Sequence, residues 1–165
     1  MNTRLAKPAD ADAIAKIHVE AWHATYSGII PADDLASMTY AKQSVIWKRR
    51  LEGEKAVTLV IESDGDVSGW LSFGPSRDPG SPQSTEIYGL YIAPQKRRSK
   101  LGTRLLESMW SYVQEGDVTL WVLAQNLPAI RFYERMGFDG DGAEKEAVFG
   151  TAKLVERRFA KRAQR

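Results

Sequence analysis

Runs of β-branched, aromatic and large apolar residues recur along the chain and are typical of strands. They predict strands over Thr3–Lys7, Ala56–Glu62, Val67–Phe73, Glu86–Ile92 and Val118–Leu123. The Asp-Gly pair at residues 64–65 is typical of a tight hairpin turn between the second and third of these strands. The tail, residues 138–160, is expected to hold two more strands, the last near residues 153–159.

Other stretches place apolar residues three to four positions apart, the period of a helix that packs one face on a core. These stretches predict helices over Ala11–Tyr26, Tyr40–Leu51, Leu101–Val113 and Pro128–Met136. A further helical turn is expected after Pro31. In chain order the elements are β-α-α-β-β-β-α-β-α-β-β. This order predicts an α/β (α+β) fold in which helices pack on a mixed sheet.

The length, net charge and cysteine content of the chain exclude several classes of protein. The 165 residues suffice for a sizeable core, and we expect residues 1–165 to form a single domain. The net charge of +2 is too small to indicate nucleic-acid binding. The chain has no cysteine, which excludes disulfides, thiolate metal ligands and a cysteine nucleophile, and no metal centre is predicted. With no apolar run of roughly 20 residues and no signal-peptide pattern, a cytoplasmic protein without membrane attachment is expected.

The segment from Glu86 to Met109 joins a strand to a helix through a basic turn. Pro94 ends the strand, because proline has no N–H to donate to a sheet. The turn that follows, QKRRSK, is rich in positive charge, and the helix begins directly after it. A helix start has unpaired N–H groups and a partial positive charge, so this order of elements suits a bound phosphate. The alternatives are a solvated basic turn or a nucleic-acid patch formed with the KRAQR tail.

Two segments, LYIAPQKRRSKLGTRLL and LAQNLPAIRFYERMGF, resemble the GNAT superfamily of acetyl-CoA-dependent N-acetyltransferases. The run IHVEAWHATYSGIIP is similar to a bacterial subgroup whose substrates are mostly unassigned. The resemblance implies a mostly antiparallel sheet of six to seven strands with about four flanking helices. It also implies acetyl-CoA and an amine as partners, and it suggests a homodimer. The family's N…A…FY…GF pattern is matched by Asn126, Ala129, Phe132, Tyr133, Gly137 and Phe138.

One position departs from the family's loop pattern, Q/R-x-x-G-x-G/A. The loop here reads RRSKLG over residues 97–102, so Lys100 replaces the middle glycine. Glycine lets the backbone approach a pyrophosphate closely, whereas a lysine with a positive φ costs on the order of 1 kcal/mol. The substitution keeps open a second interpretation, a non-catalytic acyl-CoA-binding or sensor protein with the same fold.

The resemblance assigns roles in cofactor binding and catalysis. The strand backbone at Leu90 and Ile92, with Tyr91 between them, is implied to hold the thioester and the pantetheine arm, and Gly89 suits a bulge there. Tyr133 is implied to protonate the departing thiolate, because a thiol pKa near ~8.5 lies close to a tyrosine pKa near ~10. Simple core packing is the alternative for this tyrosine. The other implied cofactor-binding residues are Arg97, Arg98, Ser99, Lys100, Leu101, Gly102, Thr103, Arg104, Asn126, Ala129 and Phe132.

Direct transfer in a ternary complex needs a base, because an alkylamine with a pKa near ~10.4 is almost fully charged at neutral pH. Glu86 matches a glutamate base of some histone-type members, with a solvated edge carboxylate as the alternative. His18 and His23 on the first helix are rival bases. Trp22 and Tyr26 are expected to wall the amine pocket, although Trp22 also suits the core. A small cationic primary amine, of polyamine or amino-sugar type, is the favoured acceptor. The acidic residues available to it are Glu20, Asp33, Asp34, Asp139, Asp141, Glu144 and Glu146.

Overall fold

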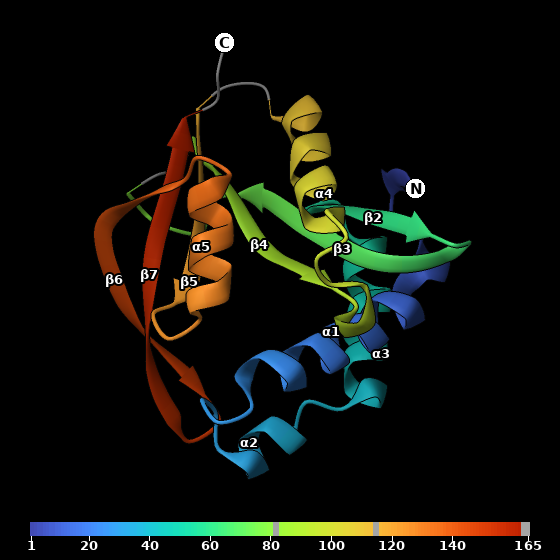
Figure 1. The fold of residues 1–165 in the computed structure, drawn as a ribbon, viewed down its shortest axis with the longest axis horizontal. Coiled ribbons are helices and arrows are strands. Elements are labelled where there is room, and N and C mark those ends of the chain that lie inside the picture. The colour runs from blue at the N-terminus through green and yellow to red at the C-terminus, as the bar shows by residue number, and fades with distance from the viewer. Residues whose placement is uncertain (81–82, 114–115, 163–165) are drawn as a thin grey trace.

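The computed structural model describes residues 1–80, 83–113 and 116–162. Seven strands form one sheet, and helices pack on both of its faces (Figure 1). The strands are β1 (Asn2–Leu5), β2 (Val57–Ser63), β3 (Asp66–Pro75), β4 (Thr85–Ile92), β5 (Asp117–Leu123), β6 (Asp139–Phe149) and β7 (Ala152–Arg162). The α-helices are α1 (Ala11–Tyr26), α2 (Ala32–Ala36), α3 (Tyr40–Glu52), α4 (Leu101–Met109) and α5 (Leu127–Arg135).

The strand order is β1-β2-β3-β4-β5-β7-β6, and β4 and β5 are the parallel pair in an otherwise antiparallel sheet. The predicted mixed, mostly antiparallel sheet is therefore confirmed. The described residues form five α-helices, because the turn expected after Pro31 closes into α2. Helix α4 is shorter than predicted: it ends at Met109 and continues as a 3-10 turn over Trp110–Tyr112. Two strands form in the tail as expected, and the last, β7, is longer than the predicted residues 153–159.

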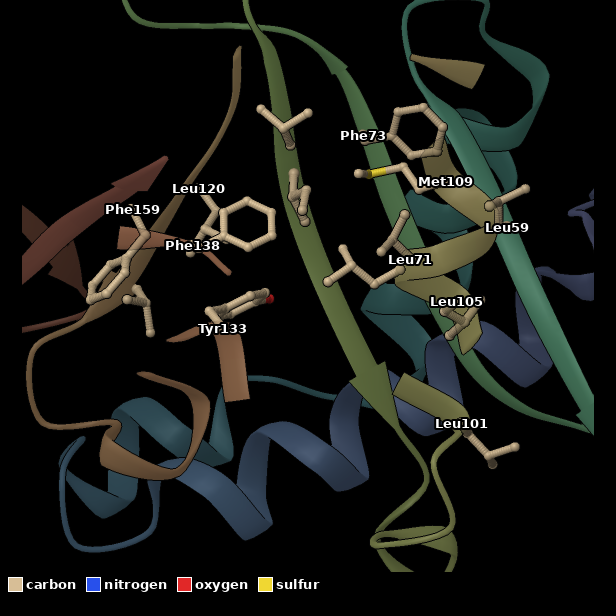
Figure 2. Close-up of a cluster of buried hydrophobic side chains, with 14 of the residues drawn as sticks. Leu59, Leu71, Phe73, Leu101, Leu105, Met109, Leu120, Tyr133, Phe138 and Phe159 are labelled. Carbon is tan, nitrogen blue, oxygen red and sulfur yellow. The ribbon is translucent and has the colours of Figure 1, made fainter. Parts of the chain in front are cut away.

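Helices α4 and α5 cover one face of the sheet and build the main core (Figure 2). Leu105 and Met109 of α4 are fully buried against β2 and β3. Helices α1 and α3 cover the opposite face, where the rings of Trp47 and Trp70 lie 4.5 Å apart. Burial of both faces over β2 and β3 fixes this half of the sheet, and β3 in turn holds the neighbouring edge of β4.

A bulge in β4 changes the direction of its side chains. Ser72 of β3 lies opposite Gly89, whereas the next residue of β3, Phe73, lies opposite Ile87, so Tyr88 is the extra residue. This insertion shifts the alternation of side chains by one position. Ile87 and Leu90, three residues apart, consequently both face the main core.

The two parallel strands stay paired only at one end. Thr85–Ile87 of β4 pair with Val118–Leu120 of β5, and beyond this point the strands diverge (Figure 1). The rest of β4, Gly89–Ile92, pairs with β3 on its other side. The edge of this segment that faces β5 is therefore free of a strand partner. The bulge predicted beside Gly89 lies at the start of this divergence.

Candidate active site

A cleft of about 990 Å³ opens between the diverging ends of β4 and β5. Its walls come from α1, β4, the loop before α4, the first turn of α4, β5, α5 and β7. Trp22 and Tyr26, which are expected from sequence to wall the amine pocket, line this cleft. The cofactor-binding residues predicted from sequence that also line it are Leu90, Tyr91, Ile92, Arg97, Arg98, Ser99, Lys100, Leu101, Gly102, Thr103, Asn126, Ala129, Phe132 and Tyr133. Arg104 is exposed and lies outside this lining.

The basic loop forms one end of the cleft and contains two strained residues. Arg98 has a φ of +65° and Lys100 a φ of +61°, both in the left-handed region that favours glycine. The Ser99 hydroxyl donates a hydrogen bond to the Lys96 carbonyl and ties the loop together. The Arg97 guanidinium donates to the Thr25 hydroxyl at 2.9 Å, which links the loop to α1. Lys100, at the position where the family's loop pattern has glycine, thus adopts a left-handed backbone conformation.

Helix α4 begins directly after Lys100, and its first turn faces the cleft. Lys100 occupies the position before the helix, and no side chain of a described residue caps the helix there. The N–H groups of the first turn consequently stay available to a bound anion. Gly102 lies under Phe132 of α5, where an added Cβ would come within 3.4 Å of the ring. A Cβ at residue 102 would thus lie in van der Waals contact with the Phe132 ring.

Helix α5 places Tyr133 in the wall of the cleft. The Asn126 side chain caps the helix by accepting a hydrogen bond from the Ala129 N–H at 3.3 Å. Gly137 follows the end of the helix, and its φ of +81° allows the Phe138 N–H to reach the Tyr133 carbonyl at 3.0 Å. Phe138 is then buried in the main core and anchors this end. Asn126 and Gly137 of the family's sequence pattern thus delimit the two ends of α5, and this fixes the position of Tyr133.

The Tyr133 ring is buried, and its hydroxyl points from α5 toward β4 (Figure 2). Burial, with a smaller effect from Tyr26, raises the pKa of Tyr133 well above its ordinary value. The phenol is therefore neutral at physiological pH and has a proton to donate.

Aromatic side chains form another wall of the cleft. The Tyr26 and Tyr91 hydroxyls lie 3.5 Å apart, and burial raises the pKa of both. Trp22 is partly buried, with its ring 4.5 Å from Tyr26 and 5.4 Å from Phe149 of β6. Trp22 therefore serves both as packing and as cleft wall.

Glu86 does not reach the cleft. Its side chain is 1% exposed, and its carboxylate accepts hydrogen bonds from the Arg77 backbone N–H at 2.8 Å and from the Arg77 guanidinium at 2.5 Å. Glu86 is not among the residues that line the cleft. The alternative of a solvated carboxylate is also wrong, because Glu86 is a buried ion-pair partner. The structure gives the proposed base role no geometric support.

The two histidines also lie outside the cleft lining. His18 is buried among aromatic rings, and its Nδ1 accepts a hydrogen bond from Trp47 Nε1 at 3.1 Å. Burial lowers the pKa of His18 to about 4, so the ring is neutral at physiological pH. His23 Nε2 lies 3.3 Å from the Met38 carbonyl oxygen. Both side chains are used in packing α1 against its neighbours.

Glu156 of β7 carries the only carboxylate among the described residues that line the cleft. None of the acidic residues proposed from sequence lines it. One sequence signal could have identified Glu156: it stands two positions after Leu154, so the two side chains share a face of the strand. Leu154 packs with Tyr26 and Leu123 on that face.

Comparison with known proteins agrees with the fold and the cleft. The Acetyltransferase (GNAT) family model matches residues 14–138. The chain is 36% identical over 137 residues to the uncharacterized N-acetyltransferase YuaI of Bacillus subtilis, covering 81% of this chain and 78% of that protein. The structure of yncA from Salmonella typhimurium with its cofactor acetyl-CoA has a TM-score of 0.72 at 22% identity, covering 100% of this chain and 95% of that one. PaiA N-acetyltransferase from Thermoplasma acidophilum, in complex with coenzyme A, has a TM-score of 0.72 at 18% identity, covering 98% and 99%.

The fold defines a class of acyltransferases in which a strand, a basic loop and the start of a helix meet at one cleft. The chain belongs to the GNAT acetyltransferase family. Within the described ranges, no helix is long and apolar enough to cross a membrane. The same ranges hold no group of three or more His, Asp or Glu side chains that could bind a metal ion.

Proposed function

We propose that the protein transfers an acetyl group from acetyl-CoA directly to a primary amine in a ternary complex. One observation carries the proposal: a single cleft joins an anion-binding helix start, an unpaired strand edge and a buried neutral tyrosine. These are the groups that binding, acyl activation and thiolate protonation require. A cytoplasmic location and a homodimer stay predictions.

The basic end of the cleft would hold the pyrophosphate of acetyl-CoA. The first-turn N–H groups of α4 supply hydrogen-bond donors and a partial positive charge. Arg97, Arg98 and Lys100 add full charges within the same lining. The β5-facing edge of β4 would then pair with the pantetheine arm, much as an added strand pairs with a sheet edge.

The reacting groups would meet beside Tyr133. Acetyl-CoA supplies the acetyl group as a thioester. The β4 backbone at Leu90 and Ile92 would donate hydrogen bonds to the thioester oxygen, which gains negative charge as the amine attacks. Tyr133 would protonate the sulfur as the C–S bond breaks. The chain has no cysteine to carry an acyl-enzyme, which agrees with direct transfer.

The left-handed backbone of Lys100 supports a second candidate, an acyl-CoA-binding protein without catalysis. Thermal unfolding with excess acetyl-CoA, followed by thiol release with a panel of primary amines, separates the two. Cofactor at about 100 times its Kd adds roughly 2.7 kcal/mol of stability, a rise in Tm of about 5–10 °C. A shift with thiol release supports the enzyme, and a shift without release for any amine supports the binding protein. No shift at millimolar acetyl-CoA contradicts both.

A further inference from the structure

Glu156 lies on the substrate side of the cleft, across the β4–β5 gap from the basic loop. β7 pairs with β5 on the far side of that gap from α4 (Figure 1). Glu156 stands opposite Leu123 of β5 and Lys145 of β6 in the sheet register. The lining of the same cleft includes the aromatic side chains of Trp22, Trp121 and Phe149.

The Glu156 carboxylate forms an ion pair with Lys145, but the two groups share no hydrogen bond. Its side chain is 18% exposed, and Lys145 Nζ lies 3.6 Å from its carboxylate, beyond hydrogen-bond distance. The other titratable groups that feel its charge are Tyr26 of α1, Tyr91 of β4 and Arg77 of the segment between β3 and β4. Glu156 lies close enough to contribute to the raised pKa of each of these three groups.

The other fully charged side chains that line the described cleft are cations. They are Lys96, Arg97, Arg98, Lys100, Arg131 and Arg135, and each lies in or beside the loop, α4 or α5. A protonated amine entering the cleft is repelled by this group and attracted by Glu156. The distribution of charge thus separates a phosphate end from an ammonium end.

We propose that Glu156 binds the ammonium group of the acceptor and removes its proton, and that the acceptor is a primary amine with an apolar or aromatic body. This inference rests on the proposed acetyltransferase function. The aromatic walls suit such a body and attract a cation through their ring faces. Once the acceptor has displaced water, burial disfavours both charges. The proton then moves more easily from the ammonium to the carboxylate, which leaves a neutral amine and a neutral acid.

The proton balance is closed. Glu156 takes one proton from the ammonium and passes it to solvent. The neutral nitrogen then bonds to the acetyl carbon while the C–S bond breaks. The nitrogen loses its second proton to solvent, the sulfur gains the phenolic proton of Tyr133, and the Tyr133 phenolate takes one proton back from solvent. The products are an N-substituted acetamide and the free thiol of CoA.

The test compares Glu156→Gln with Glu146→Gln, using 2-phenylethylamine and L-phenylalanine as acceptors. Glu146 is the matched control because it pairs with Lys153 on the same hairpin, is 58% exposed and lies outside the cleft lining. At about pH 7 we expect kcat/KM of Glu156→Gln to fall by about 100-fold or more. At about pH 9.5 the gap should narrow at least about tenfold, because solvent then supplies neutral amine. Glu146→Gln should stay within about twofold of wild type at both pH values.

Two further measurements guard the interpretation. The acetyl-CoA-induced rise in Tm should be the same in all variants, which shows that each variant folds and keeps its cofactor site. Glu156→Asp, which retains the charge one methylene further back, should recover part of the activity lost at about pH 7. A loss of kcat/KM in Glu156→Gln with either acceptor supports the proposal. The acceptor that the wild type prefers shows whether the site accepts a carboxylate beside the amine, as in L-phenylalanine.

Failure of this inference differs from failure of the proposed function. Wild-type protein that releases no thiol with either acceptor or with the wider amine panel overturns both. Wild-type activity that Glu156→Gln retains within about threefold overturns only the role of Glu156. A loss of equal size at both pH values also overturns the base role, because a purely structural defect does not depend on the amount of neutral amine.

Discussion

The strongest test of the basic loop is the exchange of Lys100 for the glycine that the family pattern has at this position. Lys100 has φ +61° and ψ +11°, and its carbonyl accepts the Arg104 N–H at 3.1 Å, so this conformation begins α4. An L-residue pays about 1–2 kcal/mol for the left-handed conformation. Glycine adopts it freely, but its more flexible unfolded chain costs about 0.4–1 kcal/mol. The difference predicts that Lys100→Gly stabilises the protein by about 0.8 kcal/mol.

The assay is thermal unfolding of wild type, Lys100→Gly and Lys100→Ala, each with and without acetyl-CoA. For a chain of this length, about 0.8 kcal/mol raises Tm by about 2–3 °C. Lys100→Ala removes the same charge but keeps a Cβ in the strained conformation, so its Tm should match that of wild type. The two variants together separate backbone strain from charge.

The cofactor shift adds a second comparison. If the Lys100 ammonium reaches a phosphate, both variants should lose the same part of the acetyl-CoA-induced rise in Tm, because both lack the charge. If the acetyl-CoA-induced rise in Tm is larger in Lys100→Gly than in Lys100→Ala, the gain in cofactor binding comes from the backbone conformation. The reasoning fails if Lys100→Gly melts no higher than Lys100→Ala, because the left-handed residue would then carry no cost.

Three further predictions concern the acid, the buried carboxylate and the buried histidine. Tyr133→Phe should lower kcat by about 100-fold while keeping Tm and the acetyl-CoA shift, and an unchanged kcat would reduce Tyr133 to a packing residue. Glu86→Gln should lower Tm by several degrees, because a buried partner of Arg77 is lost at about 1–3 kcal/mol, and should leave kcat/KM nearly unchanged; a large kinetic loss at unchanged Tm would restore Glu86 as the base. The folded-state pKa of His18, about 4, lies below its unfolded value of 6.5, so the unfolded state binds more protons between these values and stability falls as pH drops through this window. Between about pH 7 and about pH 4.5 urea unfolding should register a loss of about 2 kcal/mol, which His18→Asn, with an acceptor kept for Trp47, should not show.

Local patterns in the sequence predicted the elements and most of the cleft lining. Caps and stops such as Asn126 and Gly137 act within a few residues, so the segment they delimit could be recognised from sequence alone. The sign of φ at Lys100 could not, because both signs suit a turn before a helix.

The positions of the Glu86 and Glu156 carboxylates depend on contacts between distant parts of the chain, which the sequence pattern does not indicate. Glu86 is paired with Arg77, which lies in the loop before β4, and no periodicity indicates that pairing. Glu156 comes to the cleft only because β7 inserts between β5 and β6. A charged residue on the apolar face of a strand was the one available signal, and it becomes decisive only with the strand order known.

The two ends of the cleft also bear on how a reaction there would finish. Acetylation converts a cation into a neutral amide, so the attraction that we propose between Glu156 and the acceptor disappears with the chemistry itself. The cationic loop keeps its attraction for the phosphates of CoA, because these do not change. We therefore expect the amide product to leave readily and CoA to be held longer. Inhibition by added CoA should consequently be much stronger than inhibition by N-acetyl-2-phenylethylamine, and comparable inhibition by the two would argue against this division of charge.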